Sequence, residues 1–234
     1  MAQTRILMVL TSNKRLGMHE GETGLWLSNF AAPFYAFEDA GMAPEVATIG
    51  GGAPAIDPAS KTDAQDADAV KRCLEDERLQ SGLYHAPALR EVQTSAYDAI
   101  FLPGGRGATW DHPASAELTV ALEQFALQGK PMAAVGHGAA GLVPVMDKRS
   151  QPLTRDRKVA CASIEEETAA GFDRVVPFLI EAKLRDLGAM IEPAQPGQPR
   201  VAVDEFLITG QNAASALPAA QALIEMIRGA RIAA

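Results

Sequence analysis

A histidine between two glycines, His137, stands at the centre of the residues that could do chemistry in this 234-residue chain. The preceding residues 132–135 form a short apolar run without charge, which predicts a buried strand of a parallel sheet. Gly136 to Gly138 break that strand, and the small residues 139–142 allow a helix to begin close to the sheet. Enzymes place a nucleophile in such a turn, because amides at the start of a helix stabilise a thiolate or an oxyanion. Here the turn residue is Gly136, which adopts positive φ without strain but has no side chain that could attack a substrate.

The histidine itself could act as an acid or a base. His137 could take a proton from a water molecule or from a substrate C–H group, while backbone amides hold the oxyanion that forms. The amides expected to do so are those of Gly104, Gly105 and Gly138. Two of these glycines lie in a loop that follows the predicted strand 97–102, where glycine allows a backbone N–H to approach a reacting oxygen closely.

Arg106 follows the two loop glycines and allows two interpretations. Its guanidinium group could bind a carboxylate or a phosphate through two parallel hydrogen bonds. It could equally be a solvated arginine on a surface loop. The sequence leaves both interpretations open.

The chain has two cysteines, Cys73 and Cys161, whose spacing matches neither a disulfide framework nor a metal motif. Cys161 could be a nucleophile that has moved away from the turn, but a buried and unreactive thiol is the favoured interpretation. The sequence predicts no metal site and no cofactor.

Several separated motifs carry a family resemblance. The stretch Ala-Val-Gly-His-Gly-Ala-Ala at 134–140 resembles the nucleophile elbow of the DJ-1/PfpI (ThiJ) superfamily, which is related to class I glutamine amidotransferases. The family pattern there is roughly Ala-Val-Cys-His-Gly-Pro-Ala. Further stretches resemble the branch that contains heat-inducible chaperones and glutathione-independent glyoxalase III, and they lie at 23–26, 103–105, 176–179 and 208–215.

The resemblance implies an activity and also shows where this chain departs from it. In that branch the elbow cysteine adds as a thiolate to an α-oxoaldehyde such as methylglyoxal, and lactate leaves without glutathione; a deglycase activity uses the same thiolate. Gly136 stands at the cysteine position. A glutamate on the first helix tunes that cysteine in the family, and Asn29 is placed at this position, where an amide cannot hold a proton as a carboxyl does.

An acidic residue orients the elbow histidine in the family. Glu166 is the expected match, and together with His137 it would form a remnant acid–base pair, while Glu165 and Glu167 stay open as alternatives. The resemblance also implies a homodimer.

Three functions follow from these residues. The favoured one is a pseudoenzyme that keeps a small-molecule pocket, for an anion or a carbonyl compound, or that has a chaperone-like role. The second is an enzyme of the lyase, hydratase or hydrolase type in which His137 is the general base. The third is a glyoxalase III or deglycase that acts on methylglyoxal with Cys161 as a relocated thiol.

Strands and helices alternate along the chain, which predicts an α/β fold: a flavodoxin-like three-layer sandwich with a mainly parallel sheet and helices on both faces. We expect a single domain over residues 1–234, with a small, mostly helical insertion at about 50–95. The strand pair at 201–209 is expected to be antiparallel.

Composition limits the partners. A net charge of −8 disfavours nucleic acid and anionic membranes. No apolar run approaches the roughly 20 residues of a membrane span, and residues 1–15 do not resemble a signal peptide. We therefore expect a cytoplasmic protein that meets a small-molecule ligand.

Overall fold

The computed structural model describes the backbone of residues 3–233 and the side chains of residues 3–229. Six strands form one twisted sheet in the order β2-β1-β3-β4-β8-β7. Their bounds are β1 Arg5–Leu10, β2 Ala43–Thr48, β3 Ala99–Leu102, β4 Met132–Val135, β7 Val201–Asp204 and β8 Leu207–Gly210. Neighbouring strands run parallel except at the edge, where β7 pairs antiparallel to β8. The predicted parallel sheet and its antiparallel pair at 201–209 are both confirmed.

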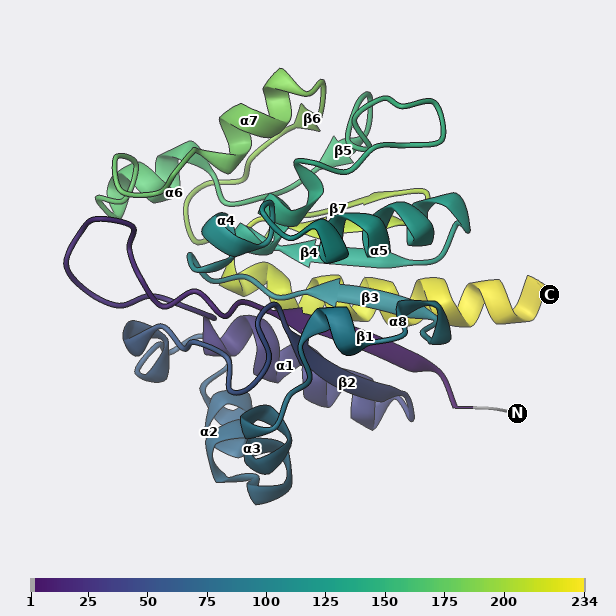
Figure 1. The fold of residues 1–234 in the computed structure, drawn as a ribbon. Helices are drawn as coiled ribbons and strands as arrows, with labels where there is room; N and C mark the ends of the chain where they lie inside the picture. The colour runs from purple at the N-terminus through teal and green to yellow at the C-terminus, as the bar shows by residue number, and fades with distance from the viewer. Residues whose placement is uncertain (1–2, 234) are drawn as a thin grey trace.

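Helices cover both faces of the sheet (Figure 1). α1 (Leu27–Asp39) and α8 (Ala216–Ala233) pack against each other on one face, and α5 (Ala116–Leu127) lies on the other face. The interior strand β1 is buried on both sides, so its alternate residues enter two separate cores. Ile6, Met8 and Leu10 join the core beneath α1 and α8, and Leu7 and Val9 join the core beneath α5. The predicted three-layer α/β architecture is confirmed.

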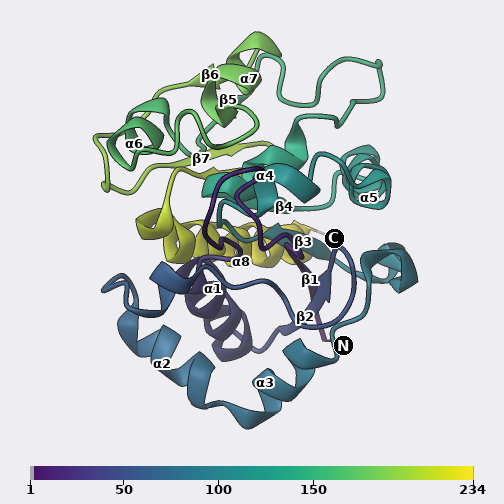
Figure 2. The same ribbon diagram turned by 60° about the vertical axis from the view of Figure 1, so that its left-hand side comes forward.

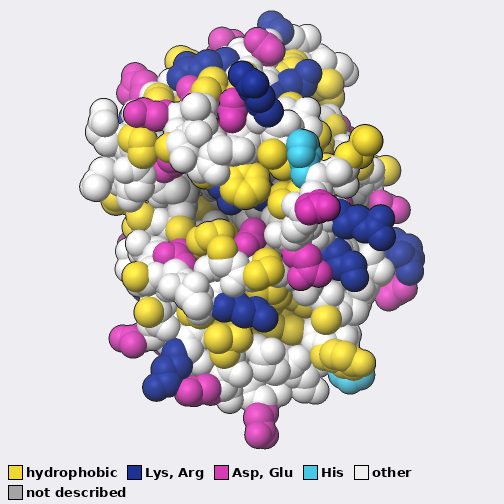
Figure 3. Space-filling view, turned by 90° about the vertical axis from the view of Figure 1, so that its left-hand side faces the viewer, with side chains coloured by type: hydrophobic (Ala, Val, Ile, Leu, Met, Phe, Trp, Pro, Cys, Tyr) yellow, Lys and Arg dark blue, Asp and Glu magenta, His cyan; other side chains and the backbone are white. Residues whose placement is uncertain are grey.

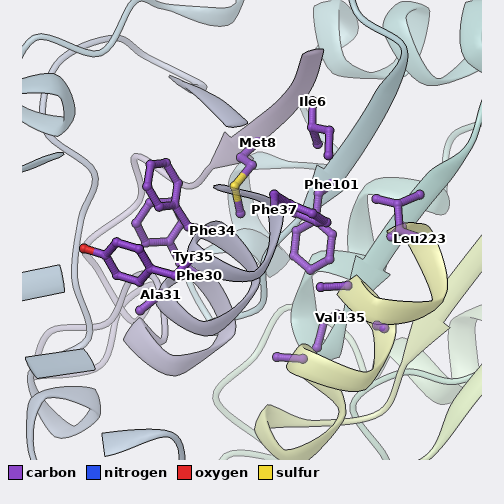
Figure 4. Packing of buried hydrophobic residues seen from close by; sticks show 14 of the residues in the cluster. Ile6, Met8, Phe30, Ala31, Phe34, Tyr35, Phe37, Phe101, Val135 and Leu223 are labelled. Atoms are coloured by element: carbon purple, nitrogen blue, oxygen red, sulfur yellow. The ribbon is translucent and has the colours of Figure 1, made fainter. Parts of the chain in front are cut away.

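Aromatic side chains fill the core beneath α1 (Figure 4). Phe37 meets Phe101 of β3 edge to face, with ring centroids 5.5 Å apart, and Phe30 lies 5.4 Å from Phe34 along the helix. This packing fixes α1 against β3, and so positions the helix whose first turn lies at the candidate site.

The segment between β2 and β3 packs beside α1, on the opposite side of the molecule from α6 and α7 (Figures 1 and 2). Its buried Val70, Cys73, Leu79 and Leu83 extend the core beneath α1. It contains α2 (Ala67–Glu75) and α3 (Glu77–Tyr84), with the 3-10 turns η1 (Pro58–Lys61), η2 (Leu89–Glu91) and η3 (Thr94–Ala96). This is the segment that the sequence predicts as a mostly helical insertion.

The remaining elements lie on the α5 side of the sheet or at its carboxyl edge (Figure 1). They are α4 (Ala108–Asp111), the 3-10 helices η4 (Gly136–Leu142) and η5 (Ala213–Ser215), α6 (Ile164–Ala169), α7 (Ile180–Asp186) and the two-stranded sheet of β5 (Lys158–Val159) and β6 (Met190–Ile191). Within the described residues, none of the helices is long and apolar enough to span a membrane.

Candidate functional site

The turn after β4 keeps the geometry of an elbow without a side chain at its tip. Gly136 has a φ of +55°, a conformation that residues with a Cβ adopt only at a cost. A Cβ added there would lie 3.6 Å from Nδ2 of Asn29, 3.7 Å from the Gln211 carbonyl oxygen and 4.0 Å from Cα of Gly104. These are ordinary contact distances, so the position that a cysteine side chain would take is sterically open.

Asn29 lies beside this position, in the first turn of α1, and its side chain is buried. Its Oδ1 atom is buried without a hydrogen-bond partner among the described residues. Its Nδ2 atom faces both Gly136 and Gly104, and a Cβ on Gly104 would overlap it and come within 2.6 Å of the Val135 carbonyl oxygen. Gly104 therefore has to be glycine so that α1 and the elbow can approach each other.

His137, Glu167 and Arg106 meet around one carboxylate oxygen. Oε1 of Glu167 lies 3.1 Å from Nε2 of His137 and accepts a hydrogen bond from Nε of Arg106, also at 3.1 Å. The Arg106 guanidinium group stacks on the Phe172 ring, 3.9 Å from its centroid. Burial acts to raise the pKa of the Glu167 carboxyl, but His137 and Arg106 outweigh it and the pKa is lowered. Glu167 is therefore a buried, ionised group whose charge Arg106 compensates and which His137 contacts.

The prediction that Glu166 orients His137 is wrong in this structure, because the neighbouring Glu167 makes that contact. Glu166 folds back at the start of α6, where it accepts from the N–H and hydroxyl groups of Ser163 in a capping box. It also accepts hydrogen bonds from the amide of Gly197 and from Nδ2 of Asn212. Glu165, the other alternative, is exposed.

A cavity of about 220 Å³ opens beside the elbow. It is smaller than the roughly 300–1,000 Å³ of sites that take drug-sized ligands, which suits a small molecule. Its walls are Trp26, Asn29, Gly105, Arg106, Gly136, His137, Ala162, Glu166, Glu167, Gln211, Asn212 and Ala213. Figure 3 views the edge of the molecule toward which β3 and β4 point, and acidic and basic side chains are interspersed over it.

Most of the predicted site residues line this cavity, but two glycines do not. Gly104 lies behind Asn29, and a Cβ on Gly138 would overlap the Leu102 carbonyl oxygen, so Gly138 packs against the end of β3. Gly105, with a φ of +132°, supplies the loop backbone at the cavity wall. Gly104 and Gly138 do not line the cavity, so the structure gives no support to the prediction that their amides hold an oxyanion there.

Sequence reasoning missed Trp26 and Gln211 as wall residues. Trp26 lines the cavity, and its indole Nε1 donates to Asp63 at 2.6 Å. The side-chain amide of Gln211 accepts a hydrogen bond from the N–H group of Ala194 and donates one to its carbonyl oxygen. This pair of hydrogen bonds fixes the loop after β6. The sequence did contain a signal for Gln211, because the residue belongs to the motif 208–215, which begins within β8, the strand next to β4.

Cys161 does not reach the cavity. Its thiol is buried in the core beneath α5, and it is the adjacent Ala162 that lines the pocket. Burial raises the pKa of Cys161, and the nearby Glu181 carboxylate raises it further. The described residues also hold no cluster of His, Cys, Asp and Glu that could bind a metal ion.

Comparison with known proteins agrees with this architecture. Residues 24–226 match the DJ-1/PfpI family, so the chain belongs to the DJ-1/PfpI family. The human glutamine amidotransferase-like class 1 domain-containing protein 1 is 32% identical over 182 residues, which cover 77% of this chain and 78% of the human protein. The glutathione-independent glyoxalase HSP31 of Saccharomyces cerevisiae is 25% identical over 238 residues, 97% of this chain and all of the yeast protein.

Solved structures show the same fold over nearly the whole chain. The rapid encystment protein of 24 kDa from Francisella tularensis is 34% identical with a TM-score of 0.91, and the match covers 96% of this chain and 99% of that one. Glyoxalase III from Candida albicans, at 22% identity, has a TM-score of 0.86 over 95% of this chain and 97% of its own. The second comparison concerns the fold alone.

Proposed function

We propose that this protein binds a small carbonyl compound in the elbow cavity and does not carry out thiol-dependent glyoxalase chemistry. The glycine at position 136 is the observation that carries the proposal, because covalent catalysis at an elbow needs a nucleophile there. The amide of Asn29 beside it supports the same conclusion, since it cannot share a proton with a thiol. The cavity itself is intact, with a compensated carboxylate and an imidazole in its wall.

An anionic ligand, which Arg106 suggests in the sequence, has less support. The Arg106 guanidinium group is paired with Glu167, and a second carboxylate, that of Glu166, also lines the cavity. With His137 neutral, the formal charge of the wall is therefore negative, which opposes binding of a carboxylate or a phosphate.

The first test is the formation of lactate from methylglyoxal without glutathione. We expect the wild-type protein to form lactate no faster than buffer, and Cys161→Ser to behave identically. Turnover that survives Cys161→Ser would overturn the pseudoenzyme proposal, and turnover that this substitution abolishes would favour the relocated thiol instead.

The second test detects binding. Trp26 lies in the cavity wall, so a Trp110→Phe variant leaves Trp26 as the one tryptophan of the chain and as the reporter of occupancy. Titration with dihydroxyacetone should change its fluorescence to saturation, and His137→Ala should weaken that response. A fluorescence that stays constant up to high concentrations, together with unchanged NMR shifts of the Gly136 amide, would contradict the proposal.

A second candidate function is favoured by the contact between His137 and Glu167. The Glu167 carboxylate lies 3.1 Å from Nε2 without completing a hydrogen bond in this structure; it would favour a proton on that nitrogen, and Nδ1 would then be the atom that accepts a proton from water or from a substrate C–H group. Release of a solvent-exchangeable proton is therefore the reaction to look for: wild-type protein should exchange the α-protons of dihydroxyacetone with deuterium, and His137→Ala should not.

A cytoplasmic location, a homodimeric state and a chaperone-like role stay predictions from the family resemblance. Light scattering on the purified chain would test the dimer. Suppression of the thermal aggregation of a client protein would test the chaperone role, with His137→Ala as the control, because a role separate from the cavity should not depend on His137.

A further inference from the structure

Asn29 presents an unused hydrogen-bond donor to the cavity. Its side chain is 4% exposed, it lines the cavity, and its Nδ2 atom lies 3.6 Å from the position of a Cβ on Gly136. The hydrogen bonds of the described residues include none from this Nδ2 atom, and its Oδ1 atom is buried without a partner. A side-chain amide that makes no hydrogen bond within the described residues is costly unless a ligand or water in the cavity completes its bonds.

The neighbouring charges restrict what that ligand is. Glu167 and Glu166 are the carboxylates of the wall, and Arg106 is its one guanidinium group. The Nε and Nη2 atoms of Arg106 are paired with Glu167, and its guanidinium group stacks on the Phe172 ring. The donor that remains for a ligand beside Gly136 is thus a neutral amide in negatively charged surroundings, which suits an uncharged acceptor better than an anion.

We infer that Asn29 is the specificity-determining residue of this cavity: its Nδ2 donates to the oxygen of an uncharged carbonyl group, and the site discriminates against the corresponding carboxylate. The small size of Gly136 allows that carbonyl group to lie against the amide. This inference rests on the proposed function, since it names the ligand class that the same cavity takes.

A matched pair of probes tests it. Lactamide and lactate have nearly the same shape, but lactamide is uncharged and lactate carries a carboxylate. We expect the Trp110→Phe protein to bind lactamide at least tenfold more tightly than lactate, as measured by Trp26 fluorescence at fixed ionic strength. Asn29→Asp replaces the donor with an acceptor of the same shape and should weaken lactamide binding about tenfold or more, the loss of one buried hydrogen bond.

Two further variants complete the design. Asn29→Ala removes the donor without adding a charge and should weaken lactamide binding to a similar extent. Ser28→Ala alters the neighbouring residue of the same helical turn, whose buried hydroxyl does not line the cavity, and should leave binding unchanged. Thermal unfolding of each variant shows that it is folded.

The outcomes separate the two proposals. If wild-type protein binds neither probe nor dihydroxyacetone, the carbonyl pocket itself is refuted, and the role of Asn29 with it. If lactamide binds but Asn29→Asp and Asn29→Ala bind it as tightly as wild type, the inference on Asn29 is refuted while the pocket stands. Lactate binding as tight as that of lactamide would refute the discrimination by charge.

Discussion

Restoring a cysteine at the elbow tests how much of the family chemistry the surroundings still support. In Gly136→Cys the new Cβ would meet no atom closer than the 3.6 Å contact with Nδ2 of Asn29, so the Cβ displaces no neighbour, and the cavity beside Gly136 is where the thiol would lie. The remaining cost is the left-handed conformation, which disfavours a residue with a Cβ by about 1–2 kcal/mol. For a chain of this length, 1 kcal/mol corresponds to about 2–4 °C, so we expect the melting temperature to fall by about 2–8 °C.

The catalytic result depends on a second position. The new thiol would face the Asn29 amide, which cannot take up its proton, so the single variant should form little lactate from methylglyoxal. Gly136→Cys combined with Asn29→Glu places a carboxyl beside the thiol and should be clearly faster. The measurement is lactate production without glutathione, with thiol reactivity followed in parallel as a function of pH.

Two results would contradict this reasoning. A single variant as fast as the double variant would show that Asn29 does not limit the chemistry. A destabilisation of Gly136→Cys far above 2 kcal/mol would show that the space beside Gly136 is not open. Asn29→Glu alone is the control, because without the thiol it should form no lactate.

Three other predictions concern buried groups. Glu167→Gln should lower the free energy of unfolding by about 3 kcal/mol in urea titrations, because it leaves a buried cation without its carboxylate, whereas Glu166→Gln should cost less than about 1 kcal/mol, because a glutamine at this position also completes a capping box. Burial lowers the pKa of the fully buried His112, so the unfolded state binds more protons than the folded state: stability should fall as the pH drops below about 6.5, and His112→Phe should remove this slope. Burial raises the pKa of Cys73 to about 11 and raises that of Cys161 as well, so neither thiol should react with Ellman's reagent at pH 8 until the protein unfolds; rapid reaction in the native state would contradict the structure.

Local patterns predicted the elbow well. The apolar run 132–135 followed by Gly136 specifies a buried strand and a turn with positive φ, and both are features of a few neighbouring residues. Asn29 was placed by the family resemblance, which also rests on short local motifs, and it lies in the first turn of α1. Such signals do not depend on distant parts of the chain.

The sequence did not determine which glutamate of α6, Glu166 or Glu167, contacts His137. Neighbouring residues on a helix point about 100° apart, so an error of one position changes the direction of the carboxylate completely. The capping box of Ser163 and Glu166 was visible in the sequence, and it would have assigned Glu166 to the helix start. The pairing of Arg106 with Glu167 could not be read in this way, because it joins residues 61 positions apart on different elements.

The buried carboxylate of Glu167 is the strongest argument that this cavity still has a use. Ion pairs of this kind contribute little net stability, and apolar residues of similar volume commonly replace them without loss. Glu167 nevertheless lies buried with one oxygen shared by Arg106 and His137, while its Oε2 atom has no partner among the described residues. A glycine at position 136 costs the fold nothing, so it could persist without any function, but a compensated acid and a histidine aimed at the same cavity could not be explained by packing alone. Under the proposed function, this polar wall would hold the ligand even though position 136 carries no thiol.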